Sequence, residues 1–276
     1  MIALARTSLW TVGYLAFVAG AVLMLIPMLW MLSTSLKPLP DVFKIPIQWI
    51  PLPPHWEVYT DAWTRFPFER YFLNSLIVTG AVTFLNVLLS GFAGYGLAKY
   101  HLFGRRALFL VILSTLMLPI EVLMVPTFLI VKGFGWVNTY QGLIVPVVAD
   151  AFGVFLMRQF MLTVPDSLLE AARIDGASEL GTYFRIVLPL VWPAILTLTI
   201  FTWRETWDAF VWPFIIVTED RMFTIPLGLQ RFQEQYVTTY NEVMAISTIA
   251  MLPLVLMFFL FQRAFIRGIA LTGLKD

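Results

Sequence analysis

Long apolar runs separated by short polar stretches define the pattern of this sequence. Each run can cross a hydrocarbon layer ~30 Å thick at ~1.5 Å of rise per helical residue. The first run has no charge between Arg6 and Lys37, so it is too long for the core of a signal peptide. The pattern predicts an all-α integral membrane protein, one transmembrane domain over residues 1–276 with six spans at about 9–36, 72–98, 107–131, 140–162, 184–217 and 243–262.

The segment between the first two spans, residues 37–71, holds seven prolines. A long helix is not expected there, because proline lacks an N–H and fixes φ. Its aromatic residues suit a water–lipid interface and suit a partner contact equally well. These residues are Trp49, Trp56, Tyr59 and Trp63.

Small and proline residues mark the spans themselves. Ser90, Gly94 and Ala98 recur at i, i+4 and i+8 near the end of the second span, which permits close packing of another helix. Prolines interrupt the third, fourth and fifth spans at positions 119, 126, 146, 189, 193 and 213.

One polar stretch, residues 165–189, carries six charged side chains and must lie outside the bilayer core. Ser167 and Glu170 have the S-x-x-E spacing of a capping box, and Gly176 can end a helix in a left-handed conformation. A second short helix can start from Ser178. The sequence therefore predicts two short helices at about 166–183 with a turn at Gly176. Taken alone, Glu170 would be interpreted as a helix cap.

The distribution of Lys and Arg predicts the orientation. If both termini and the 165–189 stretch are cytoplasmic, ten of the 18 basic residues fall on that side and seven on the other, and Arg204 lies within a span. The short, acid-free loop 99–106 weighs most, because short loops follow the positive-inside rule best. We expect a multi-pass membrane protein with both termini in the cytoplasm.

Composition excludes several functions. The chain is 59% hydrophobic and 13% charged, with a net charge of +1, which argues against a nucleic-acid partner. It has no Cys and only two distant histidines, His55 and His101, so no metal site is expected. No G-x-x-x-x-G-K-[ST] phosphate loop and no Ser/His/acid set is present, so the chain is expected neither to bind ATP itself nor to be an enzyme.

The spacing Glu170-Ala171-Ala172, Gly176, Ile186 and Leu188-Pro189 resembles the EAA motif of permease subunits in binding-protein-dependent ABC importers. Further stretches resemble the second sugar permease of the maltose- and glycerol-phosphate-importer type, although Asp208 stands where similar permeases have Asn. These stretches include 27–30, 35–37, 74–75, 138–144, 207–213 and 262–268. The resemblance therefore spans the whole chain.

This resemblance implies a type I ABC importer fold in the inner (cytoplasmic) membrane of a prokaryote, with cytoplasmic EAA coupling helices. It implies two ATP-binding subunits that hold ATP and Mg²⁺, a second permease, an extracytoplasmic solute-binding protein, a sugar substrate and membrane lipid as partners. The residues that it implies couple the chain to the ATPases are Glu170, Ala171, Ala172, Asp175 and Gly176. It also implies that the 219–242 loop contacts the binding protein, through Gln230, Phe232, Tyr236 and Tyr240.

Ionisable side chains inside spans are costly in lipid and usually face a cavity or a partner. They predict a translocation pathway lined by Glu121, Asp150, Arg204, Glu205 and Asp208, with the aromatic side chain of Trp207 beside them for a sugar ring. For Arg204 and Asp208 the i, i+4 spacing supports mutual pairing equally well. Two other functions stay open: a permease for glycerol phosphate or another polar solute, in which Arg204 would face an anion, and a membrane scaffold that recruits an ATPase without transport.

Overall fold

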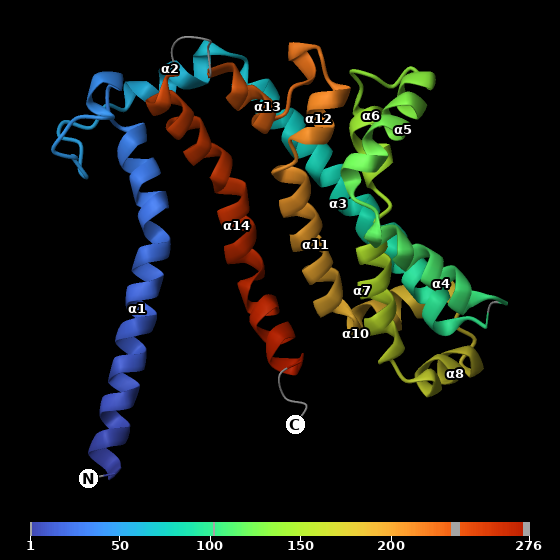
Figure 1. Cartoon of the computed structure of the whole chain (residues 1–276). Coiled ribbons are helices and arrows are strands. Elements are labelled where there is room, and N and C mark those ends of the chain that lie inside the picture. The colour runs from blue at the N-terminus through green and yellow to red at the C-terminus, as the bar shows by residue number, and fades with distance from the viewer. Residues whose placement is uncertain (1, 102, 233–237, 273–276) are drawn as a thin grey trace. The chain divides into compact units, whose positions relative to one another are not determined.

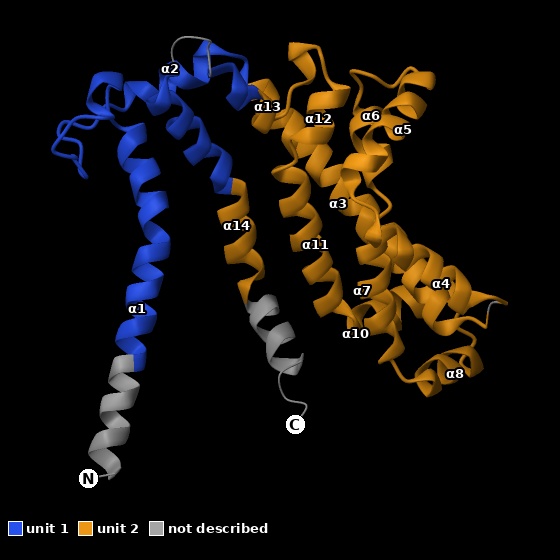
Figure 2. Cartoon of the chain, viewed as in Figure 1, with its two compact units in different colours: residues 1–68, 228–252 blue, residues 69–227, 253–276 orange. Residues whose placement is uncertain are grey.

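The computed structural model describes residues 2–101, 103–232 and 238–272, with side chains described for 13–101, 103–232 and 238–262. The elements in these residues are helices, which confirms the predicted all-α fold (Figure 1). The chain forms two compact units (Figure 2). Unit 1 comprises residues 1–68 and 228–252, and unit 2 comprises residues 69–227 and 253–276.

Unit 1 is built on two long apolar helices. They are α1 (Ile2–Ser35) and the first part of α14 (Tyr240–Thr272). Residues Gly13–Ser35 of α1 are apolar enough to cross a membrane, and none of their most apolar window is buried within the chain, as expected for a helix whose surroundings are lipid or another subunit. The short elements of the unit are η1 (Leu39–Asp41), α2 (Glu57–Arg65) and η6 (Gln230–Phe232).

Unit 2 is built around α3 (Phe68–Lys99), another helix that is long and apolar enough to cross a membrane. Its remaining elements are shorter. They are α4 (Arg105–Ser114), η2 (Thr115–Met117), α5 (Ile120–Gly133), α6 (Tyr140–Ile144), η3 (Val145–Val147), α7 (Ala151–Leu162), α8 (Asp166–Ile174), α9 (Glu179–Thr182), the π-helical turn η4 (Tyr183–Val187), α10 (Leu188–Leu190), α11 (Trp192–Trp207), α12 (Val211–Ile216), η5 (Asp220–Met222) and α13 (Ile225–Leu229).

Three helix pairs of unit 2 are bent where the sequence predicted continuous spans. The bends are 103° between 105–117 and 120–133, 47° between 140–147 and 151–162, and 80° between 179–190 and 192–207. A proline explains the first and third bends: Leu118 before Pro119 is extended, and Pro193 lies in the first turn of α11, two residues after the break at Val191. Counting each bent pair as one span, the described residues hold up to six spans.

Glycines let α3 and α7 pack closely. A Cβ at Gly94 would lie 2.8 Å from both the backbone nitrogen of Arg158 and the Cβ of Met157, and one at Gly153 would collide with Ser90. The structure thus confirms that the small-residue stripe of the second span lies against another helix. Met157 and Met161 of α7 are fully buried at this contact, in one core cluster with Leu198 of α11.

Candidate functional site

The helix–turn–helix segment (residues 166–182) consists of α8 and α9 joined by a turn at Gly176. Gly176 has φ +77°, the left-handed conformation that favours glycine. The Ala177 N–H donates to the Ala172 carbonyl at 2.9 Å, which closes α8 in a Schellman turn. The Ser178 hydroxyl then accepts from the Gly181 N–H at 3.1 Å and caps α9. The structure confirms both the turn and the second helix start.

The predicted capping box is wrong. Helix α8 starts at Asp166 with Pro165 as its N-cap, so Ser167 already lies inside the first turn and accepts no capping hydrogen bond. Pro165 is extended and has no N–H, so no backbone donor is left unpaired at this position. Within the described residues, Glu170 has no hydrogen-bond partner, and its side chain faces out.

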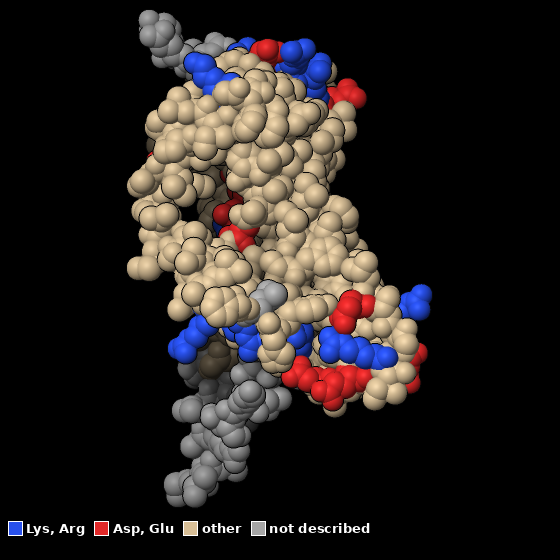
Figure 3. Space-filling view, turned by 90° about the vertical axis from the view of Figure 1, so that its right-hand side faces the viewer, with Lys and Arg blue, Asp and Glu red and all other residues tan. Residues whose placement is uncertain are grey.

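The two faces of α8 differ in chemistry. Leu169 and Ala172 are buried against the rest of unit 2. Glu170 and Ala171 are exposed, and Ile174 is 86% exposed at the turn. In Figure 3 acidic and basic side chains gather at the lower end of the face, where α8 lies in Figure 1. The segment therefore offers a carboxylate, a small side chain and an apolar tip to the outside.

The end of α3 holds this segment. Lys99, whose side chain is 4% exposed, donates through Nζ to the Val164 carbonyl and, at 2.7 Å, to Oδ1 of Asp166. The Tyr100 hydroxyl donates to Oε2 of Glu179 at 2.7 Å. The sequence did not predict these contacts, because the partners are 65 to 79 positions apart and no local pattern marks them.

Charges shift the pKa values in this network. The bond to the Glu179 carboxylate raises the pKa of the Tyr100 hydroxyl to about 12, because the phenol must keep its proton to donate. The hydrogen bond from Lys99 lowers the pKa of Asp166. Arg173 donates to Oε1 of Glu179 at 3.0 Å, which raises the Arg173 pKa. At neutral pH the Tyr100 phenol therefore keeps its proton, while the lowered pKa values of Asp166 and Glu179 favour their carboxylate forms.

The predicted pathway residues lie at helix breaks and helix ends of unit 2. Asp150 caps α7 by accepting from the N–H groups of Phe152 and Gly153 at 3.1 and 2.9 Å. Arg204 and Asp208 pair at 3.7 Å, with side chains 71% and 50% exposed. Glu205 lies between them in sequence, in the last turn of α11. Arg204, Glu205 and Asp208 therefore gather at the end of α11, and Asp150 lies at the start of α7.

The other two pathway candidates differ in their surroundings. Trp207 is 3% exposed, and its ring packs against Trp203 and Phe72 at 6.3 and 5.7 Å between centroids. Glu121 is exposed in the first turn of α5. Among the described residues, no hydrogen bond or ion pair joins Glu121 to the other candidates. Figure 3 shows acidic side chains in a recess half-way along an otherwise nearly uncharged belt.

Sequence reasoning missed a polar line along α3. Asn86 donates to the Val148 carbonyl at 3.1 Å, at the break before α7, and lies 3.5 Å from the hydroxyl of Thr202 in α11. The hydroxyls of Thr79 and Thr83 are buried with no partner within the described residues. The sequence contained a signal for this line: helical periodicity places the polar residues at positions 75, 79, 83, 86 and 90 on one face of α3.

Two asparagines that contribute to the family resemblance have structural roles. Asn74 donates to the carbonyls of Arg221 and Phe223 at 3.0 and 2.8 Å. Asn138 has φ 58°, and its Oδ1 accepts from the N–H groups of Thr218 and Glu219 at 2.7 and 3.1 Å. Both side chains therefore satisfy the backbone of the 218–223 loop.

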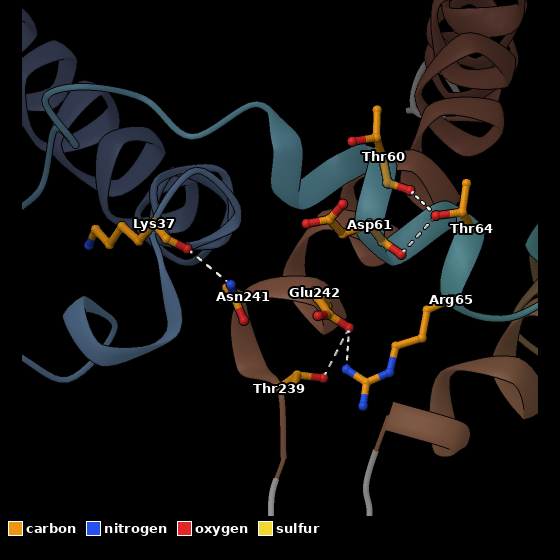
Figure 4. Close-up of polar contacts among 8 residues, drawn as sticks. All are labelled: Lys37, Thr60, Asp61, Thr64, Arg65, Thr239, Asn241 and Glu242. Carbon is orange, nitrogen blue, oxygen red and sulfur yellow. Dashed lines mark hydrogen bonds and ion pairs between the residues drawn. The ribbon is translucent and has the colours of Figure 1, made fainter.

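The base of the predicted binding-protein loop lies in unit 1. Phe232 is buried between Phe66 and Phe68, with centroids 5.1 and 5.3 Å away. Nη1 of Arg65 donates to Oε2 of Glu242 at 2.9 Å, as Figure 4 shows. These contacts tie the loop to α2.

The remaining loop candidates have different placements. Gln230 is exposed, and Tyr240, 42% exposed, packs edge-on against Phe43 at 5.2 Å. Tyr236 lies outside the described residues. Asn241, in the first turn of α14, donates to the Lys37 carbonyl at 3.1 Å (Figure 4).

A family model described as the inner membrane component of binding-protein-dependent transport systems matches residues 86–271. The chain is 34% identical over 265 residues to the arabinooligosaccharides transport system permease protein AraQ of Bacillus subtilis, covering 95% of this chain and 94% of that one. It is 35% identical over 237 residues to the sn-glycerol-3-phosphate transport system permease protein UgpE of Pectobacterium atrosepticum, covering 83% and 84%.

Two further comparisons extend this similarity. The diacetylchitobiose uptake system permease protein NgcG of Streptomyces coelicolor is 31% identical over 258 residues, covering 91% of this chain and 84% of that protein. A chain in the crystal structure of a bacterial ABC transporter that imports alginate superposes with a TM-score of 0.83 at 21% identity, covering 91% of this chain and 94% of that one. The folds therefore agree over nearly the whole length.

Proposed function

Because the chain belongs to the family of binding-protein-dependent transport system inner membrane components, we propose that it forms, with a second permease, the translocation pathway for a sugar or oligosaccharide. It is a transport subunit of the inner membrane and not an enzyme. Separate ATPase subunits supply the energy and hold ATP and Mg²⁺. Relatives named for arabinooligosaccharide and diacetylchitobiose transport support a carbohydrate substrate.

The observation that carries this proposal is the helix–turn–helix segment. It is fixed to unit 2 by buried Leu169 and Ala172 and by Lys99, while Glu170 and Ala171 are free to meet a partner. Since Glu170 caps no helix, its carboxylate is available to a cation on an ATPase subunit. Asp175 and Gly176 set the turn that presents it. In this proposal the segment lies in the cytoplasm together with both termini.

The test of this docking role is recovery of the ATPase with the purified permease. Removing one partner of a desolvated charge pair costs roughly 2–5 kcal/mol, so Glu170→Lys is expected to abolish recovery and Glu170→Gln to reduce it. Gly176→Val has the same effect, because a branched side chain strains the left-handed turn. Glu69→Lys, the same charge change at an exposed carboxylate of α3, is the control. Normal recovery in Glu170→Lys and Gly176→Val would contradict the proposal.

Orientation is tested with single cysteines, since the native chain has none. A cysteine at Ser178 is expected to react with an impermeant maleimide only from the cytoplasmic side, and one at Trp56 only from outside. Reaction of Ser178→Cys from outside would reverse the orientation and remove the ATPase from reach of the segment.

The pathway proposal assigns Asp150, Arg204, Glu205 and Asp208 to one polar surface, with Glu121 as a further candidate. Carboxylates accept hydrogen bonds from sugar hydroxyls. Trp207, also a candidate from the sequence, is 3% exposed and would support the end of α11 rather than stack on a sugar. For the binding-protein contact we propose Gln230, Tyr236 and Tyr240, with buried Phe232 as the anchor of the loop.

A second candidate substrate is glycerol phosphate or another anion. It is favoured by the exposed guanidinium of Arg204 and by similarity to the sn-glycerol-3-phosphate permease. Uptake assays with Arg204→Gln separate the two, because an anion loses its counter-charge whereas a neutral sugar does not.

A further inference from the structure

The loop between α1 and α2 presents large apolar side chains outward. Seven of them are 53% to 89% exposed, although they lie in one segment of 14 residues. Between Lys44 and Glu57 the only polar side chains are Gln48 and His55. A contiguous apolar surface of this kind marks contact with a partner or with lipid. The seven residues are Phe43, Ile45, Ile47, Trp49, Ile50, Leu52 and Trp56.

Internal contacts hold this loop in shape. The His55 N–H donates to the Leu36 carbonyl at 3.0 Å, which brings the end of the loop back to the end of α1. Val42 is 5% exposed and packs inward, and Phe43 contacts Tyr240. The outward side chains therefore belong to a closed, anchored loop, which in Figure 1 projects sideways from the end of α1.

One aromatic contact sets the depth of the loop relative to the membrane. The ring of Trp49 lies 5.4 Å from that of Trp30, edge to face. Trp30 precedes the end of α1 by five residues, so it lies ~7–8 Å along the axis inside an apolar span. The loop therefore lies level with the last turns of the span, at the depth of ~5–10 Å that interfacial elements reach.

The composition of the loop favours lipid over a protein partner. Protein interfaces are only ~56–58% non-polar in area, whereas the stretch 45–56 is apolar apart from two side chains. Tryptophan is enriched at membrane–water interfaces. Four prolines in this stretch also lack an N–H, so fewer backbone donors lose water on insertion.

We propose that residues 43–56 insert into the headgroup region of the bilayer at the end of α1 and anchor unit 1 to the lipid surface. On the proposed orientation this is the outer leaflet, so this assignment of the side rests on the proposed function. The loop leads into α2, whose Arg65 bonds to Glu242 beside the 230–240 loop. Insertion thus sets the height at which that loop meets the binding protein.

The test uses the importer complex in lipid vesicles with an environment-sensitive dye on one cysteine, at Ile50, at Leu52 or, as a control, at the exposed Asp61 of α2. The dye at Ile50 and Leu52 is expected to emit at shorter wavelength and to be quenched by nitroxide-labelled lipid. The dye at Asp61 is expected to be quenched by aqueous iodide instead.

Equal quenching by iodide at all three positions, with no effect of nitroxide lipid, would overturn the proposal. So would shielding from iodide without nitroxide quenching, because a protein would then cover the loop. Nitroxide quenching at Ile50 combined with access of iodide to Asp61 only from the cytoplasmic side would support the anchor and refute the proposed orientation.

Discussion

Lys99→Met isolates the bond between α3 and the helix–turn–helix segment. Methionine is nearly as long as the lysine stem and suits a side chain that is 4% exposed, so packing is largely kept while the charge is lost. The Val164 carbonyl then loses its donor, and Asp166 loses its ion pair.

The two losses differ in size. A hydrogen bond from a charged donor contributes ~1.5–3 kcal/mol when its partner is buried, and Val164 is 4% exposed. The ion pair contributes at most ~1 kcal/mol, because the Asp166 side chain is 78% exposed. We expect a net loss of about 2 kcal/mol, which raises the detached population of the segment roughly 30-fold at 1.4 kcal/mol per tenfold.

Hydrogen exchange of the purified importer measures this population directly. Peptides that cover residues 166–182 are expected to exchange roughly 30-fold faster in Lys99→Met, since local opening controls their exchange. Asp166→Asn, which removes only the exposed partner, is expected to change exchange less than about fivefold. Unchanged exchange in Lys99→Met, or an equal effect of Asp166→Asn, would refute the assignment of the buried bond as the main tie.

Three further predictions follow from the structure. The hydrogen bond from Tyr100 to Glu179 contributes stability that is fully present below the ordinary phenol pKa of 10.0 and is lost as pH rises towards about 12. Tyr100→Phe is therefore expected to remove one late-titrating phenol from the absorbance titration. An unchanged titration would contradict the bond. Gly94→Leu is expected to lose ~1–3 kcal/mol or more by overpacking and to lower membrane levels, whereas Gly96→Leu, which meets open space, is not; equal levels would contradict the close packing. Asp208→Asn and Glu121→Gln are expected to alter uptake at normal membrane levels, and wild-type uptake in both would remove them from the pathway.

Local chemistry explains where sequence reasoning succeeded and where it failed. The turn at Gly176 and the cap at Ser178 depend on residues within four or five positions, so their spacing is readable. The capping box at Ser167 failed because Pro165 occupies the N-cap two residues earlier than the pattern assumed. The bends at Pro119 and Pro193 had visible signals, but a proline predicts a break more readily than its angle.

Hydropathy and turn chemistry act over a few residues, so the all-α membrane fold, the apolar runs and the exposed helix–turn–helix segment are readable from the sequence. The folded chain is needed to show which distant groups meet: Lys99 with Asp166, Trp30 with Trp49 and Asn74 with Tyr140. The physical reason is that such contacts join side chains 19 to 67 positions apart, whose meeting depends on how helices pack and bend and leaves no periodic trace in the chain.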